Sequence, residues 1–351
     1  MCNAYPESDY YLYTPEYHSD IIDQYFANCK HVTIRRPSIT KPKMLAQLWR
    51  NFALSNVIQK DQLDIYHGLS HQLPATTPST KWVVTVHDLL FLRYPQYFSS
   101  IDSWIYKKKI RHSTKVADSV IAISNQTKRD LISFMKVPEQ KITVLHQSSD
   151  PVFQSRVSEA DKKEMRSRYP LPEKFILYVG ALLPHKNVLT ILKAMNHLKD
   201  DVDLHFVVVG SGLNYQKKMV AFASQSGLKD RLVFLSDQGF IDNAALRVIY
   251  QMASLFIYPS LFEGFGLPIL EALQSHVPVI ANFGLEEAGG PDSLYCRTDD
   301  DGTSLADAIK ELDLNSALRE RMIKGGLKHA QKFDHRITSE KLMRHYQSLL
   351  D

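Results

Sequence analysis

Short apolar runs alternate along the chain with longer segments in which apolar residues recur every three or four positions. The first pattern predicts buried strands, and the second predicts helices that cover them, as in parallel sheets of α/β proteins. The first half contains six predicted strands: YYLYT, HVTIRR, DIYHG, WVVTVHD, SVIAIS and ITVLH. The second half contains five: FILYVG, DLHFVVVG, RLVFLS, LFIYPS and PVIAN. The pattern therefore predicts an α/β fold with two doubly wound domains that face each other across a cleft.

A polar, charged stretch from about residue 150 to residue 172 separates the two sets of strands. Since 351 residues exceed one ordinary hydrophobic core, two domains are expected. We predict an N-terminal domain over residues 1–165, a second domain over 166–333 and a C-terminal helix over 334–351 that packs back toward the first domain. Doubly wound sheets bind ligands beyond the carboxyl ends of their strands, so the residues that follow each strand are the candidate site.

The sequence contains no apolar run long enough to cross a bilayer, and its opening, MCNAYPESDYYLYTP, lacks the pattern of a signal peptide. The expected location is the cytoplasm. The three cysteines, Cys2, Cys29 and Cys296, lack the spacing of a metal site. Scattered thiols suit a reducing compartment better than a disulfide framework, so no chemical role is predicted for them.

The net charge of +4 arises in the N-terminal part, because residues 1–165 carry 21 Lys and Arg against 16 Asp and Glu, and the remainder carries 21 against 22. The densest basic part runs from Trp104 to Lys115, where Ile101, Trp104 and Ile105 would share one helical face beside several lysines. A solvated helix face is the simpler interpretation. A peripheral contact with anionic lipid or a phosphorylated acceptor, at the inner face of a membrane, is the other. Nucleic acid is not expected as a partner, since no binding motif accompanies the charge.

The segment SLFEGFGLPILEAL follows a predicted strand and places a glycine-rich turn before a helix that starts with proline. Gly264 and Gly266 permit a tight turn and a close approach of a ligand, and proline suits the first helical position. The N–H groups of Phe265, Gly266 and Leu267 would then point toward the ligand. Together with the helix dipole they predict a phosphate site.

Two carboxylates flank this turn. Glu263 precedes it and Glu271 follows about one helical turn into the helix, so the pair can bracket one ligand. Carboxylates accept hydrogen bonds from hydroxyl groups such as those of a ribose or a hexose. A lone helical glutamate usually caps or solvates its helix, but Glu271 lies among apolar residues, where an unpaired charge is costly. A ligand or a buried partner is therefore expected for Glu271.

The turn resembles the donor-site motif of the family-4 retaining glycosyltransferases, or glycosyl transferases group 1, which have the GT-B architecture of two Rossmann-like domains. The resemblance also rests on YVGALLPHKN, VVTVHDLLFLRYPQYF, SVIAISNQTKRDL and DIYHGLSHQLP, and it covers the chain from about Tyr10 onward. It implies transfer of a hexose from a nucleotide-sugar to a glycan or lipid-linked acceptor, as in polysaccharide biosynthesis, without a metal or other cofactor. The style of the HDLLFLRYP loop favours a mannosyltransferase that uses GDP-mannose, with UDP-sugars next.

The resemblance implies roles for individual residues. Lys186, beyond the strand-end Gly180, would stabilise the departing diphosphate. Glu263 would contact the donor sugar and leaving group, Glu271 would hold the ribose hydroxyls, and Phe240 would lie near the base. The remaining donor-binding residues are Gly180 and those of the turn: Gly264, Phe265, Gly266 and Leu267.

The first half supplies the other candidates. His87 ends a strand, and the resemblance implies a catalytic contact with the donor sugar or the reacting oxygens rather than a role as base. His67, Ser124 and Asn125 also end strands, and an acceptor pocket and a structural role are equally open for them. No metal ligands are expected, because the carboxylates of TDDDG, residues 298–302, lie in a late loop where a solvated turn is the simpler interpretation.

The sequence departs from the family pattern at two places. Ala181 stands where many relatives carry an arginine, which leaves Lys186, aided by His185, as the expected phosphate ligand. Relatives also open with a strand, a glycine-rich loop and a helix before the segment that resembles YYLYT, whereas about ten polar residues precede it here. The N-terminal sheet is therefore expected to lack its central strand, or to pair YYLYT directly with DIYHG.

Two classes of function follow from this apparently short N-terminus. One is an active glycosyltransferase in which the missing piece is replaced, or was lost through a start placed too far downstream. The other is a noncatalytic sugar-nucleotide-binding or scaffold protein. A hydrolase that uses the two glutamates is disfavoured, because such carboxylates must face each other across the bond they cleave.

Overall fold

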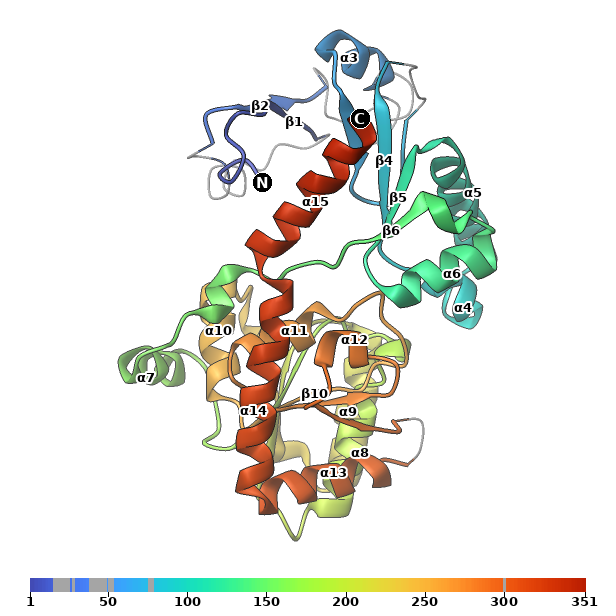
Figure 1. Ribbon diagram of the computed structural model, residues 1–351. Helices are drawn as coiled ribbons and strands as arrows, with labels where there is room; N and C mark the ends of the chain where they lie inside the picture. Colours follow the sequence, from blue (N-terminus) through green and yellow to red (C-terminus); the bar gives the residue numbers. More distant parts are fainter. Residues whose placement is uncertain (15–25, 27–28, 38–48, 50–53, 75–78, 299–300) are drawn as a thin grey trace. The chain divides into compact units, whose positions relative to one another are not determined.

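The computed structural model describes residues 1–14, 26, 29–37, 49, 54–74, 79–298 and 301–351 (Figure 1). The chain forms two compact units. Unit 1 comprises Met1–Leu92, Phe98–Leu145 and Arg336–Asp351, and unit 2 comprises Arg93–Tyr97 and His146–His335. The division at Leu145 lies before the expected boundary at residue 165, and α7 (Glu159–Arg168) packs in unit 2 against α10 (Asn243–Met252).

Unit 2 is built on a six-stranded parallel sheet with the strand order β12-β11-β10-β7-β8-β9. Its strands are β7 Phe175–Val179, β8 His205–Val209, β9 Leu232–Phe234, β10 Leu255–Tyr258, β11 Val279–Asn282 and β12 Leu294–Cys296. The five predicted strands are confirmed. The sixth, β12, was not predicted, because its three residues are too short for a clear apolar run. Since the order reverses at β7, the topological switch point lies between β7 and β10.

The helices of unit 2 form two groups (Figure 1). One group contains α8 Leu189–Leu198, α9 Leu213–Gln225 and α13 Thr303–Leu314, and the other contains α10, α11 Leu267–Gln274 and α14 Ser316–Ala330. The short helix α12 (Glu286–Gly289) packs on α11 and α14. Right-handed crossovers explain the division, because the chain runs outward from β7 in one direction and then returns to build the other half of the sheet.

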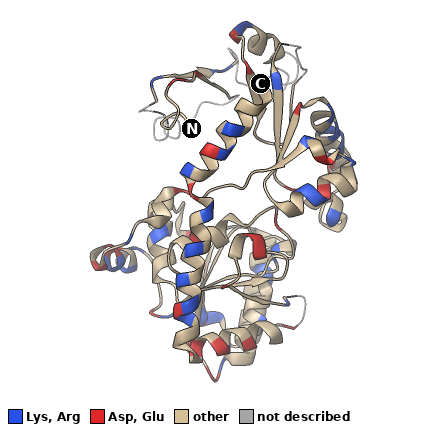
Figure 2. Ribbon diagram, in the orientation of Figure 1, with Lys and Arg blue, Asp and Glu red and all other residues tan. Residues whose placement is uncertain are grey.

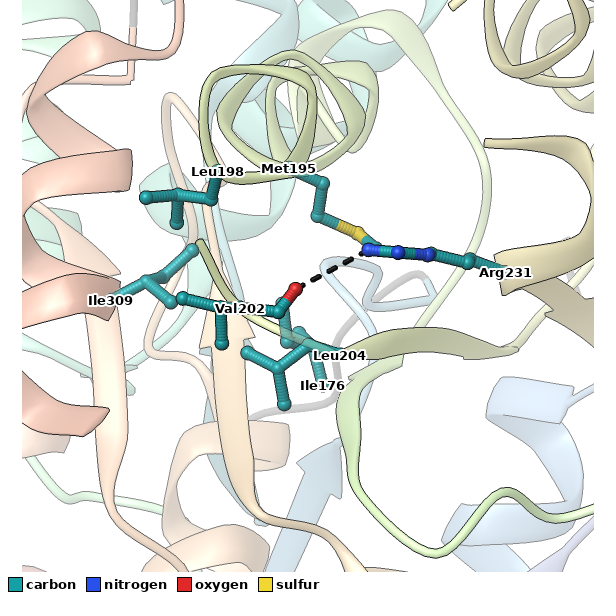
Figure 3. A pocket seen from close by; sticks show the side chains of 7 residues that line it. All are labelled: Ile176, Met195, Leu198, Val202, Leu204, Arg231 and Ile309. Carbon is teal, nitrogen blue, oxygen red and sulfur yellow. Dashed lines mark hydrogen bonds between the residues drawn. The ribbon is translucent and has the colours of Figure 1, made fainter. Parts of the chain in front are cut away.

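A small void lies at the amino ends of the strands of unit 2, opposite the switch-point loops. Figure 3 shows its lining residues: Ile176, Met195, Leu198, Val202, Leu204, Arg231 and Ile309. Arg231 donates a hydrogen bond to the carbonyl oxygen of Val202 at 3.3 Å beside it. A volume of about 10 Å³ holds one water at most, so the void is a packing defect of the core rather than a ligand site.

Unit 1 contains two parallel sheets. Strands β3 Ile65–Gly68, β4 Lys81–Val86, β5 Ser119–Ala122 and β6 Ile142–Val144 form a sheet in that order, and β1 Tyr10–Tyr13 pairs with β2 Val32–Arg35. All six predicted strands are confirmed. Two alternatives were expected for YYLYT and DIYHG. Their direct pairing is wrong, because β1 and β3 belong to separate sheets, and the described part of the chain contains no strand that pairs with both.

Side chains connect the β1–β2 pair to the rest of unit 1. The Tyr13 hydroxyl donates to Asp61 at 2.7 Å, and Arg35 also binds this carboxylate, which ends α3 (Leu54–Asp61). The rings of Tyr13 and Tyr66 lie 5.9 Å apart between β1 and β3. These side-chain contacts therefore join the β1–β2 pair to α3 and β3.

The remaining helices of unit 1 are α4 Leu90–Arg93, α5 Ser100–Val116, α6 Asn125–Met135 and α15 His335–Leu350. The C-terminal helix α15 joins unit 1 from Arg336 onward. Its Tyr346 hydroxyl lies 2.5 Å from Nδ1 of His67, and its His345 ring lies 2.9 Å from the Ser119 hydroxyl. These contacts dock the end of the chain on the strands of unit 1.

Cys2 and Cys29 form a disulfide whose Cα atoms are 5.9 Å apart, and Cys296 is free and buried. The expectation that no disulfide forms is wrong for this pair, because 27 residues separate the two cysteines and their proximity arises only on folding. Across the part of the chain that the structure describes, no helix has the length and apolar character needed to span a bilayer.

Candidate functional site

The loop after β10 forms the predicted turn. Gly266 adopts a φ of 108°, a conformation that favours glycine, and it immediately precedes α11. The N–H groups of Phe265, Gly266 and Leu267 donate to no group among the described residues, as is usual for the first N–H groups of a helix. The Phe265 ring is buried, 5.2 Å from the Phe333 ring, and it anchors the turn. The result is a row of free N–H donors at a helix N-terminus, which suits an anion.

The loop after β7 approaches the end of β8 closely. A Cβ atom on Gly210 would lie 1.8 Å from the carbonyl oxygen of Gly180, so the two backbones are in contact. Gly180 itself has a φ of 147°. The Tyr178 hydroxyl donates to the carbonyl oxygen of Ala181, which follows Gly180, at 3.0 Å. The short 3-10 helix Pro184–Lys186 then brings Lys186 to the carboxyl ends of the strands.

Lys186 and Glu263 form an ion pair at the switch point. Nζ of Lys186 lies 2.5 Å from Oε1 of Glu263, and the two side chains are only 15% and 13% exposed. The loops after β7 and β10, distant in the sequence, thus bring together the predicted cation and the first predicted carboxylate. An ammonium group has three N–H donors, so Lys186 can hold Glu263 and still bind a second anion.

Glu271 has the buried partner that its apolar surroundings predict. The Tyr250 hydroxyl, from α10, donates to Oε2 of Glu271 at 2.9 Å. Burial raises the pKa of Glu271 to about 7, although the hydrogen bond from Tyr250 acts in the opposite direction and the charge of Asp150 adds to the rise. Tyr250 was not identified from the sequence, since nothing in the pattern of α10 distinguishes it from an ordinary core residue.

Two further predicted residues lie in unit 2. Phe240 follows the β9 segment and its side chain is 89% exposed, so its ring is accessible at this edge of the sheet. His185 is buried, with its ring 5.9 Å from the Tyr97 ring and its carbonyl oxygen accepting the N–H of Leu261 at 2.9 Å. Two roles stay predictions: contact of Phe240 with the base of the donor, and help from His185 to Lys186 in binding phosphate.

The segment Arg93–Tyr97 belongs to unit 2, although its sequence resembles an N-domain loop. The Tyr94 hydroxyl donates to the carbonyl oxygen of Leu261 at 3.3 Å, and the Arg93 guanidinium lies 5.1 Å from the centre of the Phe262 ring. These contacts support the loop that carries Glu263. The sequence gives no signal for them, because Tyr94 and Leu261 are 167 positions apart.

His87 lies at the carboxyl end of β4 in unit 1. Its Nε2 lies 2.7 Å from the carbonyl oxygen of Leu69, and its ring is 5.2 Å from the His71 ring. His71 was not singled out in the sequence. It has a left-handed φ of 60°, and its buried Nδ1 has no hydrogen-bond partner among the described residues. The contact of His87 with the donor sugar stays a prediction.

The predicted acceptor-side residues also lie in unit 1. His67 contacts Thr85 through Nε2 at 2.7 Å and Tyr346 through Nδ1, and burial lowers its pKa to about 4. Its ring is therefore engaged in docking α15. Ser124 caps α6 by accepting the N–H of Thr127 at 3.0 Å, and Asn125 begins that helix. These contacts are structural, and an acceptor role for the three residues stays a prediction.

The acidic loop TDDDG is only partly described. Residues 299–300 lie outside the described residues, while the Thr298 hydroxyl donates to the carbonyl oxygen of Pro259 at 3.0 Å and Asp301 accepts the hydroxyl of Thr303. Over the described ranges, no cluster of three or more His, Cys, Asp or Glu side chains is arranged to hold a metal ion.

Known proteins resemble this chain over both units. The sequence model of Glycosyltransferase Family 4 matches residues 4–151, and that of Glycosyl transferases group 1 matches residues 161–329. The O-antigen chain mannosyltransferase B of Escherichia coli is 27% identical over 275 residues, which cover 77% of this chain and 70% of that protein. The O-antigen chain mannosyltransferase RfbU of Salmonella typhimurium is 28% identical over 245 residues, 69% of this chain and 63% of that protein.

A solved structure extends the likeness to the fold. The crystal structure of Anabaena Alr3699/HepE in complex with UDP and glucose matches with a TM-score of 0.73 and 17% identity, over 96% of this chain and 91% of that one. At this identity the likeness shows the fold alone, the GT-B arrangement of α/β units with parallel sheets. Together with the family matches, which account for most of the sequence, it shows that the chain belongs to the group 1 glycosyltransferases of family 4.

Proposed function

We propose that this glycosyltransferase moves a hexose from a nucleotide-sugar to a glycan or lipid-linked acceptor, with retention of the anomeric configuration and without a metal or other cofactor. GDP-mannose is the favoured donor, and UDP-sugars come next. The observation that carries the proposal is the meeting of Lys186 with Glu263 at the switch point, beside the free N–H groups at the start of α11.

The difficult step is departure of the nucleoside diphosphate, whose negative charge grows as the bond to the sugar breaks. Lys186 can neutralise that charge with the N–H groups that Glu263 does not use, and the N-terminus of α11 adds its dipole and its free donors. The leaving phosphate oxygen then takes the proton of the acceptor hydroxyl as the new glycosidic bond forms. No protein base is needed in this scheme.

The two carboxylates divide the recognition of the donor. Glu263, which Lys186 holds in place, accepts hydrogen bonds from the hydroxyls of the hexose. Glu271, fixed by Tyr250, accepts those of the ribose. The preference for mannose rests on two relatives that are named mannosyltransferases, whereas the complex of the structural neighbour holds UDP and glucose and keeps UDP-sugars as the second choice.

Calorimetry with GDP-mannose, UDP-glucose and ADP-glucose tests the proposal on the full chain. One of these donors should bind, and Glu271→Ala should weaken its binding by roughly 1.5 to 3 kcal/mol, the range for a lost hydrogen bond to a charged group. Glu263→Ala should mainly lower turnover. The exposed Glu320 of α14 provides a matched control, Glu320→Ala. An unchanged affinity in the Glu271 variant, or no binding of any donor, would refute the proposal.

We further propose that α5 brings the enzyme to the inner face of a membrane, where a lipid-linked acceptor would be found. The side chains of Ile101, Trp104 and Ile105 are 72%, 62% and 36% exposed, and Nζ of Lys108 lies 5.1 Å from the Trp104 ring. Figure 2 shows that basic residues gather on this helix. An exposed apolar edge beside lysines is the pattern of helices that lie on anionic lipid surfaces.

Vesicle sedimentation tests the membrane contact. Phosphatidylcholine vesicles that contain phosphatidylglycerol should bind the chain more strongly than pure phosphatidylcholine, and added salt should weaken the binding. Replacing Lys107, Lys108 and Lys109 with Gln should remove most of this difference. Replacing the exposed Lys217 and Lys218 of α9 is the control, and equal effects of the two substitutions would contradict a specific role of α5.

A further inference from the structure

An open hollow lies in unit 2 and takes no part in the chemistry above. Its lining residues are Tyr94, Leu261, Asn282, Phe283 and Arg297. Three strands end at it, since Leu261 follows β10, Asn282 ends β11 and Arg297 follows β12. A volume of about 700 Å³ is within the range of small-molecule sites, and the carboxyl ends of parallel strands are where such sheets bind ligands.

The polar walls of this hollow are held in place. The Tyr94 hydroxyl donates to Leu261, and its ring stacks on the Tyr97 ring with centroids 6.0 Å apart. Nδ2 of Asn282 donates to the carbonyl oxygen of Ser260 at 3.2 Å, which fixes the amide and leaves its Oδ1 as an acceptor for a ligand. A ligand that contacts Tyr94 and Asn282 meets fixed groups, so less free energy is lost to ordering of these two side chains.

The lining residues combine aromatic rings with one cation. The side chain of Phe283 is 56% exposed, and the half-buried Tyr94 supplies a second ring. Arg297 is exposed and makes no hydrogen bond or ion pair with any residue that the structure describes. Aromatic faces suit the C–H surface of a sugar ring, and a guanidinium binds a carboxylate or phosphate through two parallel hydrogen bonds. This chemistry fits a saccharide that carries a negative charge.

The hollow shares a loop with the donor site. Leu261, in its wall, lies two positions before Glu263, and the N–H of Leu261 is bonded to the carbonyl oxygen of His185, next to Lys186. We infer that the hollow binds an anionic sugar unit of the acceptor glycan, a uronate or a sugar phosphate. The identity of the occupant as acceptor rests on the proposed function, whereas the binding of an anionic saccharide rests on the lining residues alone.

Saturation-transfer NMR and calorimetry with three probes test the inference on the full chain: glucuronate, glucose 1-phosphate and glucose. The charged sugars should bind more tightly than glucose. Arg297→Gln should weaken their binding about tenfold or more, as expected for loss of a charge-assisted contact, and Phe283→Ala should weaken it as well. Arg321→Gln, at an exposed position of α14, is the matched control and should bind like the wild type. The charged probe that binds more tightly distinguishes a carboxylate from a phosphate.

Equal affinity of the wild type and Arg297→Gln for the charged sugars would overturn the inference. The inference would also fail if the wild type bound glucose as tightly as it binds the charged sugars. Nucleotide-sugar binding, measured on the same proteins, separates the two claims. If Arg297→Gln abolishes it, the hollow belongs to the donor and the acceptor assignment fails while the proposed function stands. If the wild type binds no nucleotide-sugar but binds charged sugars through Arg297, the proposed function fails, and the acceptor assignment fails with it.

Discussion

Replacement of Glu271 by Gln should remove a specific pH dependence from the stability of unit 2. In the wild type, burial raises the pKa of this carboxyl from 4.5 to about 7, and the Tyr250 hydroxyl bonds to it. Between these two pH values the native state binds more protons than the unfolded state. Stability is therefore lost as the pH rises from about 4.5 to about 7. A glutamine has the same shape and accepts the same hydrogen bond, but it does not titrate.

The size of the effect follows from the shift. One pKa unit corresponds to about 1.4 kcal/mol, so the wild type should lose about 2.5 kcal/mol relative to Glu271→Gln between pH 5 and pH 8. This value is an upper limit, because the side chain is partly exposed and solvent screens its charge. Subtraction of the variant cancels the pH dependence of all other groups that the substitution leaves unchanged.

Urea unfolding at pH 5 and pH 8, followed by circular dichroism, measures the difference. All three tryptophans, Trp49, Trp82 and Trp104, lie in unit 1, so their fluorescence identifies the transition of that unit by itself. Glu320 is an exposed carboxylate on α14, so the variant Glu320→Gln serves as a control for the same chemical change at the surface. Wild-type and Glu271→Gln curves that change equally with pH would refute the claim that its surroundings raise the pKa of this carboxyl.

Three other substitutions test separate parts of the structure. Lys186→Ala should lower turnover by about a hundredfold or more in a steady-state assay, the scale for loss of one preorganised stabiliser of developing charge. EDTA should change the turnover of the wild type little, and reversible inactivation by the chelator would indicate a metal site. Gly210→Ala places a methyl group 1.8 Å from the carbonyl oxygen of Gly180, so it should cost about 1–3 kcal/mol of stability. It should also weaken nucleotide binding in calorimetry. An unchanged midpoint of urea unfolding would contradict the close approach of the two backbones. Tyr346→Phe leaves a ring nitrogen of the half-buried His67 without its partner and should cost about 1–3 kcal/mol, visible in the tryptophan fluorescence of unit 1. Equal stability would show that this contact does not dock α15.

The sequence by itself determined the strands and the turn of the donor site. Eleven predicted strands are present, because each is a run of apolar residues bounded by polar ones and this local pattern requires no partner to be recognised. The turn before α11 was predictable for the same reason, since two glycines and a proline restrict the backbone wherever the segment lies. The expectation that Glu271 needs a buried partner or a ligand also came from its neighbours in the sequence.

Only the tertiary structure decided which side chains meet. The ion pair of Lys186 with Glu263 joins residues 77 positions apart, the bond from Tyr250 to Glu271 joins two helices, and the Cys2–Cys29 disulfide joins residues 27 positions apart. The assignment of Arg93–Tyr97 to unit 2 belongs to the same class. A periodic pattern of apolar residues predicts which positions of a segment face the core and which face solvent. It does not predict which other segment packs against the buried positions. Those pairings are fixed by strand order and by the packing of loops at the strand ends, which exist only in the folded chain.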